Sequence, residues 1–364
     1  MSWRCGLIGL PNAGKTTIFN ALTAARAEVA IYPFSTITPN IGVVPVPDDR
    51  LLALGQLLRP QRLTPTTIEF VDVAGLITWA SQGEGLGNQF LANIRDTDLL
   101  VQVVRCFDSP DCPHPLGSLD PERDVGVVET ELLLADLEIV GRQRQKLEKR
   151  LRVGDKALTT AVEVYRRVEE GLNQGQRAAE LPLPAAHREI LQSTTLLSLK
   201  PYLLVANVSE AELQGGRQYQ ALQALGRSRQ VPVVPILGDL EAELLELDEA
   251  ERQEFQAGLG LAEPGIIRLI RESYRLLKLV TFYTVVGPEV RAWTVPAGAK
   301  APHAAGRVHS DMEKGFIRAE VMAAADLLRL GSTAKLKEAG LLHTEGKDYV
   351  IQDGEVLFFR LQKI

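Results

Sequence analysis

The sequence predicts a doubly wound α/β fold with a mostly parallel sheet, interrupted by a helical insertion and followed by a smaller β domain. Short apolar runs alternate with segments of helical periodicity, and they lie at residues 7–8, 68–71, 99–104, 202–206 and 233–236. This alternation is typical of parallel strands joined by crossover helices. A polar segment between residues 127 and 199 interrupts it with apolar residues at helical spacing, and strand patterns return near residue 279.

The first strand leads into a glycine-rich loop. Residues 9–16 fit the pattern G-x-x-x-x-G-K-[ST], with an apolar run before them and a helical run after them. Glycines let backbone N–H groups turn toward phosphate oxygens, and a helix N-terminus adds partial positive charge. A chance glycine-rich turn is the alternative, but the strand–loop–helix context favours a phosphate-binding loop. The chain is therefore predicted to bind a nucleoside triphosphate.

This loop predicts the roles of individual side chains. Lys15 is expected to reach the β- and γ-phosphates as a catalytic group, and the Thr16 hydroxyl is expected to ligate Mg²⁺. The residues that the loop predicts to bind nucleotide are Asn12, Ala13, Gly14, Lys15, Thr16 and Thr17.

A second nucleotide element follows the next predicted strand, where Asp72 to Gly75 read D-x-x-G. In nucleotide switches such an Asp contacts Mg²⁺ and the glycine N–H meets the γ-phosphate, so that hydrolysis releases the segment. We therefore predict that Asp72 binds both metal and nucleotide and that Gly75 binds nucleotide. Between the two motifs, residues 32–40 are predicted to form a first switch, with Thr36 as a Mg²⁺ ligand and Thr38 as the alternative. A plain proline-bounded loop is the competing interpretation.

The residue after the D-x-x-G motif bears on mechanism. Ras-type enzymes place a water-orienting Gln there, whereas this chain has Leu76. An alkyl side chain neither orients nor activates water. Any hydrolysis must therefore recruit another group or a partner.

The segment that reads the base in GTPases is altered. A buried strand over residues 201–206 leads into Asn207-Val208-Ser209-Glu210, where GTPases carry N-K-x-D and use the Asp to bind guanine. Here the carboxylate belongs to Glu210 and the lysine is replaced by Val208. Because an Asn amide can pair with adenine and a mismatched buried polar contact is costly, we predict that Asn207, Val208 and Glu210 form an adenine-tolerant site. The alternative is that Asn207 caps a turn.

The insertion is predicted to form an antiparallel helical hairpin. Apolar residues recur at helical spacing in both halves, before a Leu-Pro-Leu-Pro break at residues 181–184. Arms of about thirty residues would reach on the order of 45 Å. The first arm concentrates basic side chains, which form either a solvated face or a contact for a phosphate-rich partner. They are Arg142, Arg144, Lys146, Lys149, Arg150, Arg152 and Lys156.

Taken together, these segments resemble the YchF family of Obg-like ATPases, in the translation-factor branch of P-loop proteins. The resemblance extends over essentially the whole length and rests on residues 9–12, 33–34, 70–72, 83–91, 103–107, 207–210, 289–294 and 313–319. It implies a protein that binds and hydrolyses ATP in preference to GTP and that associates with the ribosome or its subunits. It also implies that the C-terminal part is a TGS domain, a small β-grasp module found in translation and RNA-related enzymes.

The resemblance also implies catalytic roles. Asn12 is similar to a loop Asn that ligates K⁺ in related NTPases, where the ion supplies positive charge. His114 aligns with a family His in a mobile loop and is predicted to position water in place of the missing Gln, the alternative being an exposed loop His. The chain departs from the family pattern at Trp79, Pro113, Pro115 and Leu237-Gly238.

Pattern and resemblance together predict the domain organisation. Residues 1–126 and 200–278 form two parts of a P-loop NTPase domain, 127–199 form the helical hairpin, and 279–364 form the TGS domain.

Two local expectations concern the C-terminal part. Residues 349–359 read as a β-hairpin with Asp353-Gly354 at its turn. Lys314, Phe316 and Arg318 either form a basic–aromatic cluster for RNA or place Phe316 in the core between solvated basic neighbours.

Composition narrows the setting. The formal net charge of −6 over 364 residues argues against coating nucleic acid by bulk electrostatics, although it allows a local basic face. The three cysteines lack a zinc spacing, and no apolar run has the roughly 18 residues of a membrane span. We expect a cytoplasmic protein with reduced thiols and no membrane contact, and nothing in the sequence demands more than a monomer.

Three hypotheses follow. The leading one is a Mg²⁺-dependent ATPase switch with slow intrinsic hydrolysis, possible K⁺ stimulation and a ribosomal or RNA partner. The second is a GTPase of the same fold. The third is a nucleotide-gated binding protein with negligible turnover, which Leu76 permits.

Overall fold

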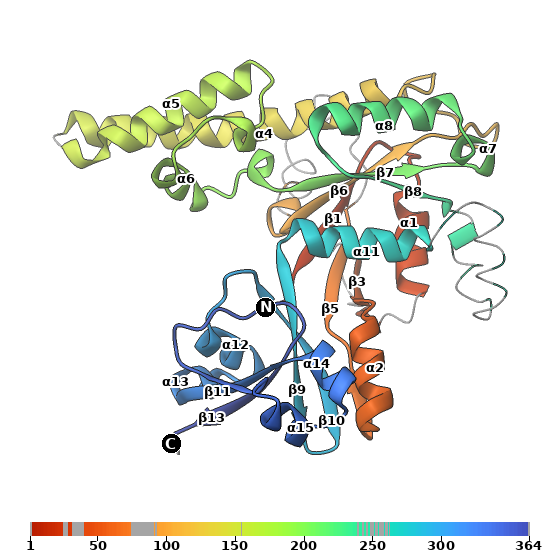
Figure 1. Cartoon of the computed structure of the whole chain (residues 1–364). Coiled ribbons are helices and arrows are strands. Elements are labelled where there is room, and N and C mark those ends of the chain that lie inside the picture. The colour runs from red at the N-terminus through yellow and green to blue at the C-terminus, as the bar shows by residue number, and fades with distance from the viewer. Residues whose placement is uncertain are drawn as a thin grey trace. The chain divides into compact units, whose positions relative to one another are not determined.

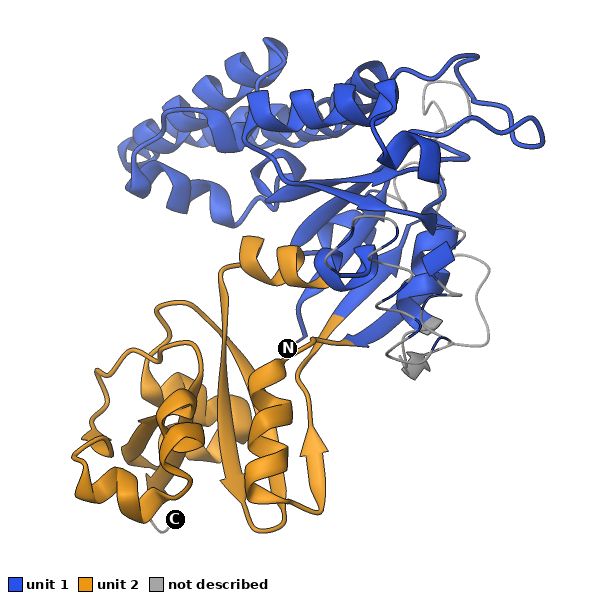
Figure 2. Ribbon diagram, turned by 45° about the vertical axis from the view of Figure 1, so that its right-hand side comes forward, with its two compact units in different colours: residues 1–44, 69–269 blue, residues 45–68, 270–364 orange. Residues whose placement is uncertain are grey.

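The computed structural model describes residues 2–24, 28–30, 40–73, 91, 93–153, 155–238, 240–241, 244, 247, 251, 254, 258, 261 and 263–362. The predicted switch residues Thr36, Thr38, Gly75 and Leu76 lie outside these ranges, as does Trp79. The chain divides into two compact units, one of residues 1–44 and 69–269 and the other of residues 45–68 and 270–364 (Figure 2).

The first unit is built on a seven-stranded sheet in the order β2-β3-β5-β1-β6-β7-β8. Strands β5, β1, β6, β7 and β8 pair in parallel in that order, and β2 runs antiparallel to β3. This arrangement confirms the predicted α/β fold. The strands are β1 (Arg4–Ile8), β2 (Glu28–Ala30), β3 (Asn40–Pro45), β5 (Thr67–Asp72), β6 (Leu99–Arg105), β7 (Tyr202–Asn207) and β8 (Val233–Ile236).

Helices cover this sheet because its central strands are apolar on both faces. Every residue of β6 is buried, as expected for a central parallel strand. On one face, α8 (Arg217–Arg229) lies over β7 (Figure 1). Its Leu222 and Leu225 share a buried apolar cluster with Leu204 and Ala206 of β7. The other helices of the nucleotide region are α1 (Lys15–Ala24) and the short α7 (Glu210–Leu213), and α11 (Gly265–Leu276) begins in this unit and continues into the second.

The insertion forms a helical hairpin with unequal arms. The first arm is the 32-residue helix α4 (Pro121–Arg152), which begins at the N-cap Asp120 with Pro121 in its first turn. The second arm, α5 (Thr159–Asn173), has only 15 residues, so the expected arm of about thirty residues is not reached. The arms lie side by side (Figure 1) and share a core that includes Val140, Val164 and Val168.

Short helical segments return the chain from the second arm to the sheet. They are η3 (Ala178–Glu180), α6 (Ala185–Gln192) and η4 (Leu197–Leu199). A further short segment, η2 (Lys156–Leu158), joins the two arms. Asp136 of α4 holds the end of this path, because its buried carboxylate accepts hydrogen bonds from the Leu197 and Ser198 backbone N–H groups at 2.9 and 2.7 Å.

The second unit contains a six-stranded sheet in the order β12-β11-β13-β9-β10-β4. Its strands are β4 (Arg62–Thr64), β9 (Leu279–Val286), β10 (Glu289–Pro296), β11 (Phe316–Ala323), β12 (His343–Glu345) and β13 (Glu355–Leu361). Its helices are α2 (Asp49–Leu58), α12 (Ala301–Val308), α13 (Ser310–Lys314), α14 (Ala324–Leu330) and α15 (Thr333–Glu338).

Residues 45–68 belong to this second unit, although the sequence pattern placed them in the nucleotide domain. The physical reason is burial of the apolar side of α2. Leu51 and Leu54 are 3% and 0% exposed and share a core with Tyr283 and Val290. Strand β4 also extends the sheet by pairing in parallel with β10.

Two expectations for the C-terminal part are settled by the sheet. The predicted hairpin over 349–359 is wrong, because β13 pairs with β11 and β9 and has no edge left for the preceding residues. Val350 instead makes a single bridge to Lys300. Phe316 is 3% exposed and packs edge-to-face on Phe359, so it is a core residue and cannot stack on RNA.

Among the described residues, none of the helices combines the length and apolar character needed to cross a membrane.

Candidate nucleotide-binding site

The phosphate loop joins β1 to α1 and depends on glycine at both ends. Gly9 and Gly14 have φ values of +148° and +91°, and Asn12 between them also has a positive φ of 60°. A Cβ on Gly9 would lie 2.4 Å from the Val103 carbonyl oxygen, and one on Gly14 would lie 2.0 Å from Asn207 Nδ2. Glycine is therefore required here by close approach as well as by backbone conformation.

Lys15 lies under this loop with its side chain directed at the loop backbone. Its Nζ donates hydrogen bonds to the carbonyl oxygens of Gly9 at 3.1 Å and Leu10 at 2.9 Å. The residue is 6% exposed. Burial lowers the pKa of Lys15 to about 8, although the nearby Asp72 carboxylate acts in the opposite direction. A bound triphosphate would place negative charge beside this buried ammonium and stabilise its charged form.

The predicted metal ligands Thr16 and Asp72 lie together. The Thr16 hydroxyl donates to Asp72 Oδ2 at 3.3 Å. Burial raises the pKa of Asp72, while the charge of Lys15 and the Thr16 hydroxyl act against that rise. A hydroxyl and a carboxylate at the mouth of a phosphate loop are hard oxygen donors of the kind that Mg²⁺ takes together with water and phosphate oxygens. These residues therefore fit a magnesium ion.

Asn207 connects three segments of the site. Its Nδ2 donates to the Ala13 carbonyl oxygen at 3.1 Å, and its Oδ1 accepts from the Gly238 N–H at 3.3 Å. The residue is 4% exposed. The amide therefore positions the phosphate loop against the ends of β7 and β8, a role that neither adenine pairing nor turn capping anticipated. Gly238 lies close beside it, since a Cβ there would lie 2.9 Å from Asn207 Oδ1.

The other two residues of the base segment differ in exposure. Val208 is 4% exposed and packs with Val104, Cys106 and Leu237. Glu210 is exposed as the first residue of α7, which Ser209 caps by accepting a hydrogen bond from the Glu212 N–H. The Glu210 carboxylate makes no hydrogen bond or ion pair with any residue that the structure describes, and it is available to a ligand. Thr17 of α1 is likewise exposed beside the site.

His114 lies in the loop after β6 and is not a free loop side chain. Its Nε2 is 2.8 Å from Asp124 Oδ2, and its Nδ1 accepts the Leu116 N–H at 3.1 Å. The imidazole is 6% exposed. The alternative interpretation of His114 as a solvent-exposed loop residue is therefore wrong.

The same loop touches the phosphate loop. Asn12 Nδ2 donates to the Pro113 carbonyl oxygen at 3.2 Å, which leaves Asn12 Oδ1 without a hydrogen bond among the described residues. That oxygen is the atom that could ligate a monovalent cation.

Arg105 was not predicted as a site residue, although it lies within residues 103–107, one of the stretches that carry the family resemblance. This last residue of β6 pairs with Asn207 of β7 and is 2% exposed. Its Nε donates to the Phe107 carbonyl oxygen at 2.9 Å, and the guanidinium lies 4.7 Å from the Phe107 ring centroid. The position of this guanidinium beside the end of β7 follows from the pairing of β6 with β7, which the sequence does not reveal.

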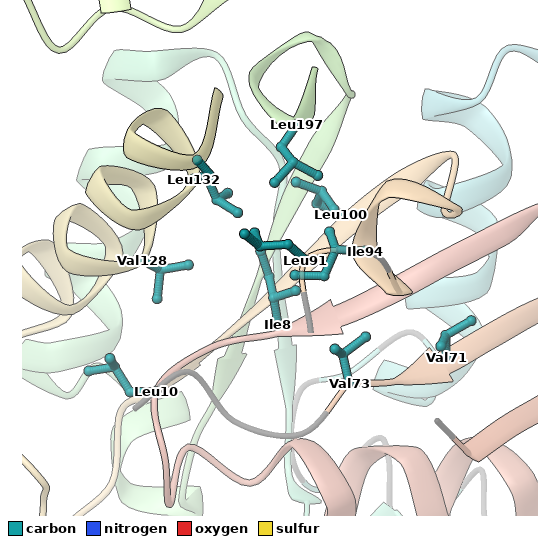
Figure 3. Close-up of a cluster of buried hydrophobic side chains, with 11 residues drawn as sticks. Ile8, Leu10, Val71, Val73, Leu91, Ile94, Leu100, Val128, Leu132 and Leu197 are labelled. Atoms are coloured by element: carbon teal, nitrogen blue, oxygen red, sulfur yellow. The ribbon is translucent and has the colours of Figure 1, made fainter. Parts of the chain in front are cut away.

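A buried apolar cluster connects the nucleotide region to the hairpin (Figure 3). It contains Leu10 of the phosphate loop, Val73 of the D-x-x-G segment, and Leu91 and Ile94 beyond it. From the insertion it takes Val128, Leu132 and Ala135 of α4 and Leu197 of η4. Because close-packed interiors transmit displacement, movement of the D-x-x-G segment would be felt by α4.

Comparison with known proteins gives matches over the whole chain. A family model described as "50S ribosome-binding GTPase" matches residues 4–135, and the YchF C-terminal model, described as "Protein of unknown function (DUF933)", matches residues 279–362. The "Ribosome-binding ATPase YchF" of Haemophilus influenzae is 46% identical over 360 residues, which cover 99% of each chain. The proteins of the same name from Escherichia coli O157:H7 and Bacillus subtilis are 45% and 42% identical, again over 99% of each chain.

Solved structures agree with these matches. The YchF GTPase of Schizosaccharomyces pombe has a TM-score of 0.87 at 32% identity, covering 99% of this chain and 98% of that one. A GTP-binding protein from Pyrococcus horikoshii has a TM-score of 0.64 at 20% identity over the full length of both chains, which shows a shared fold.

Proposed function

The chain belongs to the YchF family, as relatives 42–46% identical over 99% of its length show, and we propose that it is an ATP-hydrolysing switch that associates with the ribosome. The observation that carries this proposal is the phosphate loop, with Lys15 beneath it and Thr16 and Asp72 within hydrogen-bond distance at its mouth. The names of the relatives supply the ribosomal partner and the ATPase activity.

In this proposal the loop backbone and Lys15 hold the triphosphate. Thr16 and Asp72, with Thr36 as an expected third ligand, would hold Mg²⁺. When bound, the ion neutralises charge that develops on the phosphate oxygens. Gly75 is expected to meet the γ-phosphate through its N–H, so that hydrolysis frees the D-x-x-G segment. The apolar cluster shared with α4 supports the idea that this release alters the hairpin.

Water activation needs a substitute for the missing Gln. We propose that His114 positions the attacking water when its loop leaves the contact described above. Asn12 Oδ1 is proposed to ligate K⁺, which would supply positive charge near the phosphates. Both roles follow from the family resemblance, together with the place of His114 in the loop after β6 and the hydrogen bond that Asn12 of the phosphate loop makes to that loop.

Selectivity for ATP is proposed from the base segment. Val208 offers no ammonium to lie over a base, and Glu210 replaces the Asp that would bind guanine. With Asn207 committed to the loop backbone, adenine selectivity would depend on the absence of guanine-specific contacts rather than on Asn207 pairing with the base. Two alternatives to an ATPase remain: a GTPase of the same fold, and a nucleotide-binding protein with negligible turnover.

The partner surface is proposed on the first arm of the hairpin, where exposed basic residues suit ribosomal RNA. The TGS domain, if it contacts RNA, must do so through residues other than Phe316. We further propose that the protein acts as a monomer in the cytoplasm, where ribosomes are found.

Equilibrium binding of fluorescent ATP and GTP analogues to the purified chain, with Mg²⁺ and K⁺, tests this function. We expect tighter binding of the ATP analogue by at least about fivefold, since one mismatched polar contact costs about 1–3 kcal/mol. The double variant Val208→Lys/Glu210→Asp restores the GTPase pattern and should move the preference toward GTP. A GTP preference in the parent chain would return it to the ordinary translation GTPases. Single-turnover hydrolysis at the uncatalysed rate would favour the binding-protein alternative.

A further inference from the structure

The loop between β6 and α4 holds His114 against the start of the hairpin helix. Asp124, in the first turn of α4, is 2.8 Å from His114 Nε2, and both side chains are buried, with 6% and 5% exposed. The Leu116 N–H donates to His114 Nδ1 at 3.1 Å. Since Nδ1 accepts a hydrogen bond, the ring proton of the neutral imidazole lies on Nε2 and is donated to Asp124.

Both ring nitrogens are therefore engaged. An imidazole positions or deprotonates water through a nitrogen that is free to bind it. In the state described, His114 has no such nitrogen. It can act on water only after one of these hydrogen bonds breaks.

Asp124 is itself held in place by the neighbouring Arg123. Arg123 donates to Asp124 Oδ1 from Nε at 3.2 Å and from Nη2 at 2.9 Å. The same guanidinium donates to the Ser118 carbonyl oxygen at 2.6 Å and to its hydroxyl at 3.1 Å. Arg123 thus fixes the carboxylate and the end of the loop together. On the other side, Asn12 holds the loop through the Pro113 carbonyl oxygen at 3.2 Å.

We propose that Asp124 is a positioning residue that holds His114 away from the water in this state, so that its bond to His114 Nε2 restrains hydrolysis. The proposal rests on the proposed role of His114 in positioning water. It adds a residue to the reaction that neither the motifs nor the comparisons assign.

Single-turnover ATP hydrolysis by the full chain, at saturating Mg²⁺ and ATP and in K⁺, tests the proposal. Asp124→Ala removes the restraint and should raise the rate about tenfold, which corresponds to about 1.4 kcal/mol, a modest value for a hydrogen bond to a charged group. Asp124→Asn keeps an acceptor oxygen without the charge and should give a smaller increase. His114→Ala should lower the rate.

A double variant and a matched control make the result specific. Asp124→Ala combined with His114→Ala should be no faster than His114→Ala alone, because the acceleration must pass through the imidazole. Glu122→Gln removes a negative charge from the same helical turn at an exposed residue without a bond to His114, and it should leave the rate unchanged. Thermal unfolding of each variant shows whether α4 is intact, and Asp124→Asn decides the matter if Asp124→Ala does not fold.

The contrary outcomes are distinct. If His114→Ala is slow and both Asp124 variants are unchanged or slower than the parent, the restraint is wrong and Asp124 instead orients His114 in the working state. If the double variant remains accelerated, Asp124 acts by another route and the proposal fails. If His114→Ala is as fast as the parent, the proposed role of His114 fails and the restraint fails with it, while ATP binding measured in parallel still reports on the nucleotide site.

Discussion

At the scale of single residues, burial gives Lys15 an acid–base behaviour that nucleotide should reverse. The pKa of Lys15 lies at about 8 in the nucleotide-free chain, below its ordinary value of 10.5, because the ammonium is desolvated. A bound triphosphate favours the charged form and therefore raises this pKa. Between the two values a fraction of the free protein lacks the proton, so ATP binding must take one up, and affinity should fall as pH rises through 8.

Calorimetric titration with Mg-ATP near pH 9, in buffers with different ionisation enthalpies, measures that proton uptake. We expect a net uptake of a substantial fraction of one proton, and close to none near pH 7, where Lys15 is already charged. Lys15→Arg is the matched control, because a guanidinium stays charged at both pH values. Equal uptake in the control would show that another group is responsible. No uptake in the parent near pH 9 would show that Lys15 already carries its proton in the free chain.

The same scale shows what a motif can and cannot predict. The spacing of Gly9, Gly14 and Lys15 was sufficient to predict a phosphate loop, because local backbone geometry demands those residues. The contact of Asn207 with Ala13 joins residues 194 positions apart, and its hydrogen bonds depend on the strand order. The Asp124 partner of His114 was equally hidden, since Asp108, Asp111 and Asp120 are other carboxylates near that loop.

At the scale of elements, α4 relates the nucleotide region to the proposed partner surface. Its N-terminal half contributes to the cluster that contains Leu10 and Val73 (Figure 3). Near its other end, ion pairs occupy Arg142, Arg144 and Arg150. The basic side chains there that are exposed and make no ion pair with a described residue are Lys146, Lys149, Arg152 and Lys156. Beside them, Val153 is 90% exposed.

Neutralising two of the basic side chains at the C-terminal end of α4 should weaken ribosome binding and leave ATP hydrolysis unchanged. If Lys149 and Arg152 bind phosphates, Lys149→Gln/Arg152→Gln should lower the slope of log affinity against log salt by about 0.7–0.9 for each phosphate that is no longer neutralised. Sedimentation with purified bacterial ribosomes over a salt series measures it. Arg217→Gln/Arg227→Gln, on the exposed side of α8, makes the same charge change. Equal weakening in both variants would mean that net charge, rather than this end of α4, determines binding.

At this scale, elements defined by local hydrophobic periodicity were predicted correctly, whereas those that depend on which strands pair were not. The parallel strands of the first sheet and the helical insertion follow from periodicity in the chain. Strands β2 and β3 were not predicted. Asp353 and Gly354 do form a turn, but a turn signal does not say which strand the next segment joins, and β13 joins β9 and β11. The length of α5 was overestimated because the helix ends at Asn173, where Gly175 follows with a φ of +77°, well before the proline break at residues 181–184.

At the scale of the whole molecule, the division into units does not follow the order of the chain. Residues 45–68 leave the first unit between β3 and β5 and complete the core of the second. A prediction from sequence assigns such a segment to its neighbours in the chain, because hydrophobic pattern shows that α2 buries a face but not which partner covers it. Only the contacts of Leu51 and Leu54 decide that question.

This division predicts the behaviour of fragments. A fragment of residues 279–364, cut at the boundary that the sequence indicated, lacks Leu51 and Leu54, which are 3% and 0% exposed in the chain. Burying a leucine side chain contributes about 1.5–3 kcal/mol, so their loss, with Tyr283 and Val290 left uncovered, removes much of the roughly 5–15 kcal/mol that stabilises a domain. We expect this fragment to lack a cooperative thermal transition. Joining residues 45–68 to 270–364 through a flexible Gly/Ser linker should restore one, because α2 and β4 then return to their partners. If residues 279–364 alone unfold with the same midpoint and cooperativity as the joined fragment, α2 only covers a domain that is already complete, and the boundary near residue 279 stands.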